Sequence, residues 1–442
     1  MKKILVLGAG LVSRPGVHYL LNQTELEVTV ASRTVSKAEE LVKGFPNGKA
    51  KQVNVEDHDA LAALIKENDI VISLLPWIHH MKVAELCVEF GKHMVTTSYV
   101  SPAMKELDSK VREKGLLFLN EIGVDPGIDH MSAMKIIDEI EKEGGKILHF
   151  YSYCGGLPAP QHNDNPFGYK FSWSPRGVVL ASRNSARFLE NGKIVEIDGK
   201  DLFRNYTVEE IEGLGKFEVY PNRDSVPYKE LYGLKDALTV KRGTYRNLGW
   251  CDTFYVLNQL GFIDETPKDF IKGNTFKNIT AKVLNVSPDS NLKDAIKQKV
   301  QIEKIDDVIY RLDWLGLFSD DLVDNADNLL DMLSNRLQDK LVYKPGEVDM
   351  LLMKHTFIVE NKDGSQDKIT STMIDFGIPY GDTSMARTVS LPMAIAVKMI
   401  ANNQIKEIGV RIPNTKDIYE PVMAELEKLN IKMVEKRERI TS

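Results

Sequence analysis

Residues 3–13 read KILVLGAGLVS, and this stretch decides the fold. Its first five residues form a run that is apolar after Lys3 and partly β-branched, of the kind that predicts a buried strand. Gly8 and Gly10 then interrupt the run, and Ser13 stands where a third glycine would complete a GxGxxG motif. A helical pattern follows over 15–21. A strand, a glycine turn and a helix in this order are what a dinucleotide pyrophosphate requires, because turn and helix N-terminus present backbone N–H groups to it.

Strand-like and helix-like segments alternate from this turn as far as residue 119. Such alternation predicts an α/β fold with a Rossmann-like, doubly wound parallel sheet. The expected strands are 3–7, 27–31, 50–55, 70–75, 93–97 and 116–119, and the expected helices are 15–21, 37–42, 61–66, 81–90 and 104–114.

The remainder of the chain predicts a different organisation. β-like runs among Gly- and Pro-rich loops between 147 and 253 (HFYSYC, VVLAS, KFEVYP and LTVKRGTY) indicate a mixed or antiparallel sheet. A charged, mostly helical region spans 268–344, including 326–341, and two β-like runs around Asp363-Gly364 predict a hairpin. A helix over 388–400, a short GVRIP run and a helix over 418–429 suggest that the C-terminal end returns to the first domain.

The composition is that of an ordinary globular protein of about three domains. The 442 residues include 57 Lys plus Arg and 63 Asp plus Glu, a net charge of −6, and 43% are hydrophobic. These values argue against disorder, and the chain has neither a membrane-length apolar run nor a long basic run, so we expect no membrane and no nucleic-acid partner. Three scattered cysteines predict a reducing, cytoplasmic location, and the N-terminal run lacks a signal-peptidase site, so we expect no signal peptide.

The residues at the end of the second expected strand indicate whether the cofactor is NAD or NADP. NAD enzymes usually place an acid there to bind the ribose 2′-hydroxyl, whereas this strand ends Ser32-Arg33-Thr34. Arg33 would pair with a 2′-phosphate, which a carboxylate would repel, and the two hydroxyls would donate to it. The sequence therefore predicts NADP(H), the alternative being that Arg33 is a solvated surface residue.

Further candidates follow the ends of other strands or interrupt loops. Asp125 lies in a Val-Asp-Pro-Gly stretch, Cys154 precedes two glycines, and Arg223 and Arg246 stand beside turn residues where a carboxylate clamp is feasible. Each has a plainer interpretation, namely a turn, a packed thiol or a solvated cation. His79-His80 lacks a ligand set, so no metal is expected.

Several long motifs resemble those of one enzyme family. GAGLVSRP, ASRT, TTSYVSPAM, GVDPGIDHM, YCGGLPAP, DNPFGYKFSWSPRGV and KRGTYRNLGW are similar to segments of the glutamate-forming saccharopine dehydrogenases, also called saccharopine reductases. The resemblance extends along essentially the whole chain, and its ASRT segment is closer to the NADP-dependent branch. It implies the reversible reaction of 2-aminoadipate 6-semialdehyde, L-glutamate and NADPH to saccharopine, in lysine metabolism by the aminoadipate route.

The resemblance also implies an architecture. Residues 1–124 would form the NADP-binding domain, completed by about 390–442. Residues 125–265 and 346–389 would form a mixed α/β domain for substrate binding and dimerisation, and 266–345 a small helical domain. A homodimer is therefore expected.

Site residues follow from the matching motif positions. The resemblance assigns cofactor binding to Gly8, Gly10, Leu11, Val12, Ser13, Ser32, Arg33, Thr34, Asn54, Val55, Leu75, Thr97, Ser98, Val124, Asp125, Pro126 and Ser174. It assigns substrate contacts to Ser98, Tyr99, Asp125, Arg223, Thr244, Tyr245 and Arg246, with the TYRN segment departing from the family pattern. Tyr99, Asp125 and Cys154 are the candidate acid/base groups.

Two questions stay open at this point. The substrate amine could handle much of its own protonation, leaving the protein mainly to orient the imine. The function could also be that of a related imine reductase acting on a polyamine-type substrate, such as a carboxyspermidine-type dehydrogenase or a homospermidine synthase relative, or of a non-catalytic NADP-binding regulator. A polyamine would require acidic residues at the positions of Arg223 and Arg246.

Overall fold

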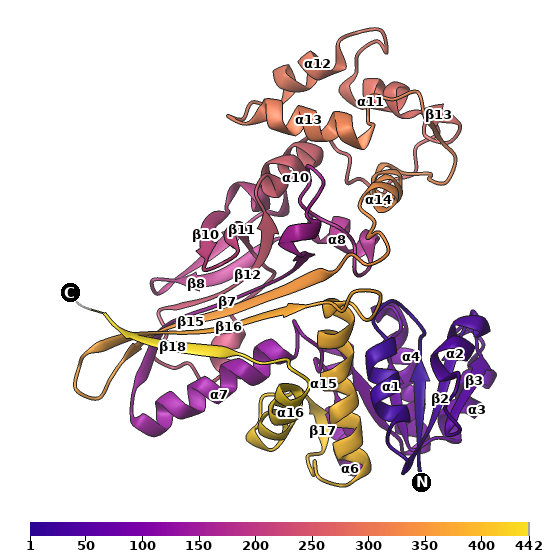
Figure 1. The fold of residues 1–442 in the computed structure, drawn as a ribbon, viewed down its shortest axis with the longest axis vertical. Helices are drawn as coiled ribbons and strands as arrows, with labels where there is room; N and C mark the ends of the chain where they lie inside the picture. Colours follow the sequence, from indigo (N-terminus) through magenta and orange to yellow (C-terminus); the bar gives the residue numbers. More distant parts are fainter. Residues whose placement is uncertain (441–442) are drawn as a thin grey trace. The chain divides into compact units, whose positions relative to one another are not determined.

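A computed structural model describes residues 1–440 and divides the chain into two compact units. Unit 1 consists of Met1–Gly144 and Gly381–Glu435, and unit 2 consists of Gly145–Tyr380 with the segment that begins at Lys436 (Figure 1). Neither unit is continuous in the sequence. The predicted division into three domains, with 266–345 on its own, stays a prediction.

Unit 1 is built on a seven-stranded sheet in which all neighbouring strands are parallel. The predicted doubly wound α/β fold is therefore confirmed. The order is β17-β6-β5-β4-β1-β2-β3. The strands are β1 (Lys2–Leu7), β2 (Leu26–Ser32), β3 (Gly48–Gln52), β4 (Ile70–Ser73), β5 (His93–Thr96), β6 (Leu117–Leu119) and β17 (Gly409–Arg411).

The helices of unit 1 agree with the predicted ones except in two places. The expected helix over 104–114 is broken at Leu107 into α5 and α6, and the helix α7 was not predicted at all. A polar group of Asp129, His130 and Ser132 is buried in α7, which obscures its apolar pattern. The helices are α1 (Arg14–Leu21), α2 (Val35–Val42), α3 (His58–Lys66), η1 (Trp77–His79), α4 (His80–Phe90), α5 (Pro102–Glu106), α6 (Asp108–Glu113), α7 (Ile128–Glu143), α15 (Ser384–Ala401) and α16 (Lys416–Lys428).

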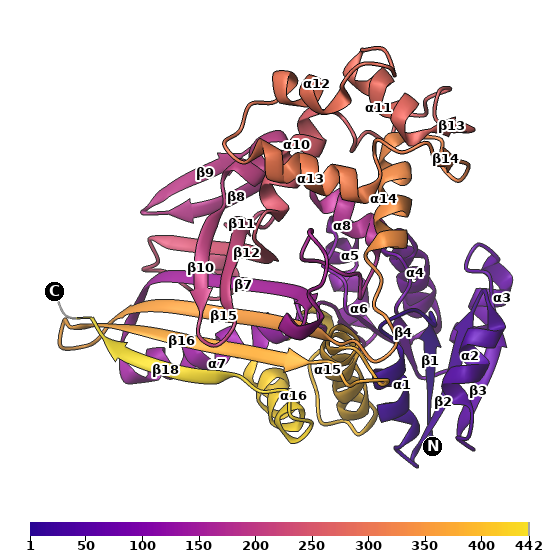
Figure 2. The same ribbon diagram turned by 45° about the horizontal axis from the view of Figure 1, so that its top comes forward.

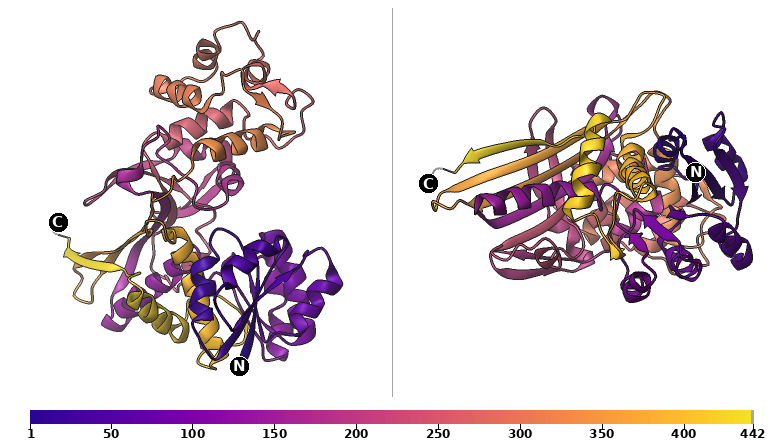
Figure 3. Two further views of the ribbon diagram at one scale, coloured as in Figure 1. Left: turned by 45° about the vertical axis from the view of Figure 1, so that its right-hand side comes forward. Right: turned by 90° about the horizontal axis from the view of Figure 1, so that it is seen from below.

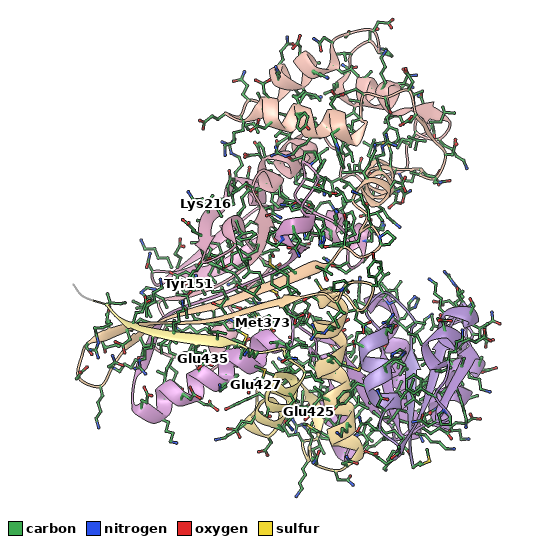
Figure 4. All side chains as sticks on the ribbon, viewed as in Figure 1. Tyr151, Lys216, Met373, Glu425, Glu427 and Glu435 are labelled. Carbon is green, nitrogen blue, oxygen red and sulfur yellow. The ribbon has the colours of Figure 1, made fainter. Side chains whose placement is uncertain are left out.

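The C-terminal part of the chain completes unit 1, as the sequence suggested. Strand β17 extends the sheet by pairing with β6, and α15 packs along α1. Figure 3 shows the yellow helices of the C-terminal part beside the indigo N-terminal part of unit 1. The Tyr19 hydroxyl of α1 donates to Glu425 of α16 at 3.0 Å, and Figure 4 labels this glutamate. Helix α15 is long and apolar enough to cross a membrane, which corrects the expectation that the chain has no apolar run of that length. Of this helix, 83% is buried inside the structure. It is therefore a core helix of unit 1.

Unit 2 contains a large mixed sheet, as predicted. Its main path is β10-β11-β12-β7-β15-β16-β18, in which β12 and β7 are parallel and β15 is antiparallel to both of its neighbours (Figure 2). Gly364 forms the predicted hairpin turn with a φ of +82°. The strands are β7 (Lys146–Pro158), β8 (Ala186–Glu190), β9 (Lys193–Ile197), β10 (Thr207–Ile211), β11 (Gly215–Pro221), β12 (Thr239–Asn247), β15 (Asp349–Glu360), β16 (Gln366–Phe376) and β18 (Val434–Arg439).

One predicted strand of unit 2 is wrong. The VVLAS run over 178–182 belongs largely to helix α8 (Pro175–Ala181), which Pro175 opens and the Ser174 hydroxyl caps by accepting from the Gly177 N–H at 3.2 Å. A proline in the first turn and a serine N-cap are helix-start signals that outweigh the β-branched pair inside the run.

The remaining helices of unit 2 share one core with the sheet. Trp250 of α10 stacks on Phe254 with ring centroids 4.2 Å apart, and the buried apolar cluster runs on into α11–α14. Figures 1 and 2 show α11, α12 and α13 together on the far side of α10 from β7 and β15. These elements are η2 (Pro160–His162), η3 (Gly199–Arg204), α9 (Tyr228–Leu231), α10 (Trp250–Gln259), β13 (Asn274–Thr275), α11 (Phe276–Leu284), α12 (Leu292–Lys299), α13 (Ile305–Leu315), β14 (Leu322–Val323) and α14 (Leu329–Lys340).

Candidate active site

The point where the strand order of unit 1 reverses lies between β1 and β4. Open α/β sheets bind ligands outside the carboxyl ends of the strands at such a point. Gly8 follows β1 there with a φ of +114°, and a Cβ added to it would lie 2.9 Å from the carbonyl oxygen of Leu74, which follows β4. Only glycine permits this approach of the two strand ends.

The turn after Gly8 leaves its backbone open. A Cβ added to Gly10 would meet nothing within 4 Å, and the neighbouring Leu11 is 71% exposed. Ser13 is fully buried and its hydroxyl donates to the Gly10 carbonyl at 2.8 Å. The serine that replaces the third glycine of the motif therefore stabilises the turn by a hydrogen bond. The predicted residues therefore form an accessible backbone cradle in front of α1, which fits a pyrophosphate.

The first turn of α1 carries no acidic side chain. Gly16 in this turn was not singled out from the sequence, yet a Cβ added to it would lie 2.6 Å from the Ser390 carbonyl oxygen of α15. The Gly16 N–H also donates to the Ser390 hydroxyl at 2.9 Å. Close helix packing, a role that the third motif glycine has in other dinucleotide sites, is provided here by Gly16.

The end of β2 presents a cation without a carboxylate partner. Arg33 is exposed and forms no ion pair within residues 1–440, while its carbonyl accepts from Gln52 at 3.2 Å. The Ser32 hydroxyl accepts from the Thr34 N–H at 3.3 Å, and α2 has no acid in its first turn. This arrangement fits a 2′-phosphate, because a guanidinium and two hydroxyls are available and no carboxylate opposes the anion.

The three predicted residues along the adenosine and nicotinamide sides lie on loops that follow strands. Asn54 is exposed and Val55 half-buried after β3, and Leu75 is half-buried after β4. Val55 also lines a cavity of about 240 Å³ together with side chains of α3 and α4, among them Leu61 and Leu86. Val55 is the one predicted cofactor residue that lines this cavity. The other predicted cofactor residues lie outside it, most of them on loops that follow the strands, where open α/β sheets bind their ligands.

The loop after β5 and the segment after β6 meet through their side chains. The Tyr99 hydroxyl donates to Asp125 Oδ1 at 3.4 Å, and both residues are half-buried. A Cβ added to Gly123 would lie 3.1 Å from the Cβ of Thr97, so the two backbones are closely packed. The structure thus brings together Thr97, Tyr99 and Asp125, which the sequence placed in one site.

Asp125 lies in a tight turn that leads into α7. The Asp125-Pro126 peptide is cis, and the Gly123 N–H donates to the Pro126 carbonyl at 2.9 Å. Gly127 has a φ of +147°, and a Cβ on it would lie 2.0 Å from the Gly123 carbonyl oxygen. Val124 and Pro126 are buried, so half-buried Asp125 is the most accessible residue of this turn.

A buried acid and a buried histidine, neither of them predicted, support the same loop. Glu121 has a φ of +56°, and its carboxylate accepts from the Val100 N–H at 2.9 Å. Its second oxygen lies 2.8 Å from His130 Nε2. Glu121 also donates its own N–H to the Ser98 carbonyl at 3.1 Å. These contacts hold the Ser98–Val100 backbone in one conformation.

In unit 2, Arg246 is buried among aromatic rings. Its guanidinium carbon lies 5.1 Å from the ring centre of Tyr169 and 5.3 Å from that of Trp250, and Nη1 donates to the Tyr245 carbonyl at 2.8 Å. Its Nε has no hydrogen-bond partner, and no carboxylate in the described part of the chain pairs with it. A buried cation without a counter-ion fits an anionic ligand.

Cys154 and Thr244 lie on the same face of the sheet as Arg246. Cys154 of β7 pairs in register with Thr244 of β12, and Arg246 is two residues further along β12. Cys154 is 6% exposed. Tyr245 points to the opposite face, where its hydroxyl donates to Glu209 at 2.6 Å, and burial raises the pKa of this phenol. Its predicted contact with substrate stays a prediction.

The other two predicted residues of unit 2 are exposed. Arg223 has a φ of +54°, and its carbonyl accepts from the Arg187 N–H at 2.9 Å. The Ser174 hydroxyl caps α8. Its predicted contact with the cofactor stays a prediction.

Residues 1–440 contain no group of three or more His, Cys, Asp or Glu side chains suited to hold a metal ion. Cys87 and Cys251 are fully buried, and burial raises the pKa of both thiols, in agreement with packing roles.

Family comparisons cover almost the whole chain. Residues 4–119 match the family model for the saccharopine dehydrogenase NADP binding domain, and residues 123–431 match that for the saccharopine dehydrogenase C-terminal domain. The chain is 44% identical over 445 residues to the saccharopine dehydrogenase [NADP(+), L-glutamate-forming] of Schizosaccharomyces pombe, a match that covers 98% of this chain and 99% of that protein.

Solved structures give the same result. The apo saccharopine dehydrogenase (L-Glu forming) of Saccharomyces cerevisiae superposes with a TM-score of 0.91 at 39% identity, covering 99% of this chain and 100% of the other. A homospermidine synthase from Legionella pneumophila in complex with NAD has a TM-score of 0.60 at 10% identity, covering 99% of this chain and 91% of the other. The second likeness shows a shared fold alone.

Proposed function

This chain belongs to the saccharopine dehydrogenase family, and from that premise we propose that it is an NADP-dependent oxidoreductase acting on a CH–NH bond. Its reaction is the reversible reduction of the imine formed from 2-aminoadipate 6-semialdehyde and L-glutamate, which gives saccharopine in lysine metabolism. The observation that carries this proposal is the 44% identity to a glutamate-forming relative over 98% of the chain.

Unit 1 has the groups that NADP(H) requires. The open backbone at Gly10 and the N–H groups at the start of α1 would hold the pyrophosphate. Ser32, Arg33 and Thr34 would hold the 2′-phosphate. When bound, the cofactor supplies or accepts the hydride. The remaining predicted residues of unit 1 would border it: Leu11, Val12, Asn54, Val55, Leu75, Thr97, Ser98, Val124, Asp125 and Pro126. The cofactor contact implied for Ser174, a residue of unit 2, stays a prediction.

Unit 2 contributes cationic groups for the substrate. Saccharopine carries three carboxylates, which require positive or hydrogen-bonding partners. Arg246 is buried with its Nε unbonded, so a substrate carboxylate would replace the missing counter-ion. Arg223 and Thr244 of the same unit would provide further contacts. The substrate contacts that the resemblance implies for Ser98, Tyr99 and Asp125 stay predictions.

Proton transfers accompany each stage of the reaction, which passes through a carbinolamine and an imine. Tyr99 and Asp125 form one hydrogen-bonded pair that can hold a proton, and Cys154 is the third candidate. The substrate amine itself can exchange protons with water. We favour a mechanism in which the protein mainly orients the imine, and no single side chain is an indispensable acid or base.

The assembly and location also belong to the proposal. A homodimer is supported by the exposed apolar side chains Ile374, Phe376 and Ile378 at the end of β16. A cytoplasmic location is supported by three cysteines that are buried and not joined in disulfides. Light scattering of the purified protein measures the first, and a monomer at micromolar concentration would contradict it.

One assay tests the proposed function. The purified protein is mixed with saccharopine and either NADP or NAD, and formation of the reduced cofactor is followed by absorbance. We expect turnover, with NADP preferred. Absence of turnover with saccharopine would contradict the proposed reaction, and a preference for NAD would contradict the role given to Arg33.

Two other functions give different results in the same assay. An imine reductase for polyamine-type substrates has support from the fold shared with the homospermidine synthase, but a polycation would be repelled by buried Arg246. A regulator without activity would bind NADPH and leave saccharopine unchanged.

A further inference from the structure

His80, the first residue of α4, bridges two serine hydroxyls. Its Nδ1 lies 2.8 Å from Ser73 Oγ at the end of β4, and its Nε2 lies 2.8 Å from Ser98 Oγ in the loop after β5. Nε2 is also 3.4 Å from Thr96 Oγ1. Ser73 and His80 are 0% and 6% exposed, whereas Ser98 is half-buried. The imidazole therefore connects the closed interior of unit 1 to a predicted ligand-binding hydroxyl.

The contacts of Ser73 determine which nitrogen of His80 carries the hydrogen. Burial lowers the pKa of His80 to about 4, so the ring is neutral near pH 7 and has one N–H. Within residues 1–440, His80 is the hydrogen-bond partner of the Ser73 hydroxyl. If Nδ1 carried the hydrogen and Nε2 accepted from Ser98, neither the Ser73 nor the Thr96 hydroxyl would have an acceptor in the described residues, which is costly for two buried donors. With the hydrogen on Nε2, only the more distant Thr96 hydroxyl is left without one. Ser73 therefore donates to Nδ1, and the hydrogen is on Nε2.

This tautomer determines the role of Ser98. Because Nε2–H donates to the Ser98 oxygen, the Ser98 hydroxyl hydrogen is left to donate to a ligand. The Ser98 backbone is fixed independently, since its N–H donates to Thr96 Oγ1 at 3.3 Å and its carbonyl accepts from Glu121 at 3.1 Å. The orientation of the hydroxyl is thus the one degree of freedom that His80 controls.

We propose that His80 is a positioning residue that orients the Ser98 hydroxyl as a hydrogen-bond donor toward an acceptor oxygen of the bound ligand. The proposal rests on the role given above to Ser98 in the proposed function. The acceptor belongs either to NADPH or to the amino-acid substrate, and the two are separated by measuring NADPH affinity and the KM for saccharopine.

Two substitutions distinguish positioning from structural support. In His80→Gln the side-chain amide reaches the position of Nε2 and can still donate to Ser98, whereas in His80→Asn the amide occupies the position of Nδ1 and contacts only Ser73. We expect His80→Asn to lose about 10-fold in NADPH affinity or in kcat/KM for saccharopine, and His80→Gln to retain most of both. Equal losses in the two variants would contradict the proposal.

A double-mutant cycle measures whether His80 acts through Ser98. We expect Ser98→Ala to lose about as much as His80→Asn, and the double variant to lose no more than either single variant. The matched control is His93→Gln, because His93 is a partly buried histidine of the same sheet whose Nδ1 accepts from the Leu117 N–H at 3.0 Å. Its effect should multiply with that of Ser98→Ala.

Multiplicative losses for His80→Asn and Ser98→Ala, or no loss for Ser98→Ala, would overturn the proposal. Thermal melts of each variant show whether a change in stability accounts for the result. If the wild-type protein bound NADPH but did not turn over saccharopine, the proposed function would fail. The coupling between His80 and Ser98 would then still be measured from the NADPH affinities of the variants.

Discussion

The backbone N–H of Gly16 donates to the hydroxyl of Ser390 at 2.9 Å, although the two residues are 374 positions apart in the chain. The contact joins α1, whose N-terminus faces the proposed pyrophosphate site, to α15. The C-terminal part of the chain therefore determines where the cofactor helix lies.

Replacing Gly16 by alanine should destabilise unit 1. The added Cβ would lie 2.6 Å from the Ser390 carbonyl oxygen, which is backbone and cannot move away cheaply. We expect a loss of about 1–3 kcal/mol in the free energy of unfolding, measured by denaturant titration. Gly10→Ala is the matched variant: its Cβ has open space, so stability should be kept while NADPH affinity falls. Equal stability of both variants would contradict the packing role of Gly16.

Replacing Arg33 by alanine should weaken NADPH binding without affecting NADH. A charge-assisted hydrogen bond to the 2′-phosphate is worth about 1.5–3 kcal/mol, which corresponds to about 10- to 100-fold in affinity. Fluorescence titration with each reduced cofactor measures the change. Lys110→Ala, an exposed cation on α6, should leave both affinities unchanged. If Arg33→Ala weakened both cofactors equally, the 2′-phosphate would not be its partner.

Replacing Arg246 by methionine should raise the KM for saccharopine. The buried guanidinium has no carboxylate partner within residues 1–440, so a substrate carboxylate is the expected one. We expect an increase of about 10- to 100-fold, with NADPH affinity unchanged. An unchanged KM would show that the charge serves only the aromatic cluster around it.

Replacing Asp125 or Cys154 by alanine tests whether the reaction has an indispensable acid or base. Because we favour proton exchange by the substrate amine, each variant should lose less than about 10⁴-fold in rate across the pH profile. Tyr99→Phe, which removes the hydroxyl that donates to Asp125, should behave in the same way. A loss of about 10⁴-fold or more in any of them would identify a required general acid or base.

The stability of the protein should fall on acidification partly because of His80. Burial lowers its pKa from 6.5 to about 4, so between these values the unfolded chain binds a proton that the folded one does not. Its stabilising contribution is fully present above pH 6.5 and is lost as the pH falls to about 4, by about 3 kcal/mol at most. Denaturant titrations between pH 4 and 7 should show a shallower dependence in His80→Gln. An unchanged dependence would contradict a neutral buried imidazole.

Local patterns predicted most of unit 1. The glycine turn, the alternation of strands and helices and the unpaired Arg33 depend on neighbours within a few residues, and these features agree with the structure. By contrast, α7 was not predicted, because the buried polar residues Asp129 and His130 interrupt its apolar face. The strand predicted for the VVLAS run is a helix, because a capping serine and a proline in the first turn outweigh the β propensity of the run.

The parts of the site that depend on distant contacts were not predictable from one sequence. His80 follows another histidine in a segment without a motif, and its role appears only once Ser73 and Ser98 stand on either side of the ring. The same holds for Glu121, whose partners Val100 and His130 come from two other segments. The hydroxyl of Tyr245 donates to Glu209, because side chains alternate between the two faces of β12. The resemblance, which implies a substrate contact for Tyr245, does not reveal this hydrogen bond.

The pairing of β6 with β17 has a consequence for how the protein is made. A ribosome adds about 5–20 residues per second, so β6 emerges on the order of tens of seconds before Gly409–Arg411 exists to cover its edge. An uncovered edge strand invites pairing with other chains. We expect nascent chains arrested before residue 409 to be retained by chaperones, and chains arrested well beyond α16 to be released, a difference that affinity capture of stalled ribosomes would measure.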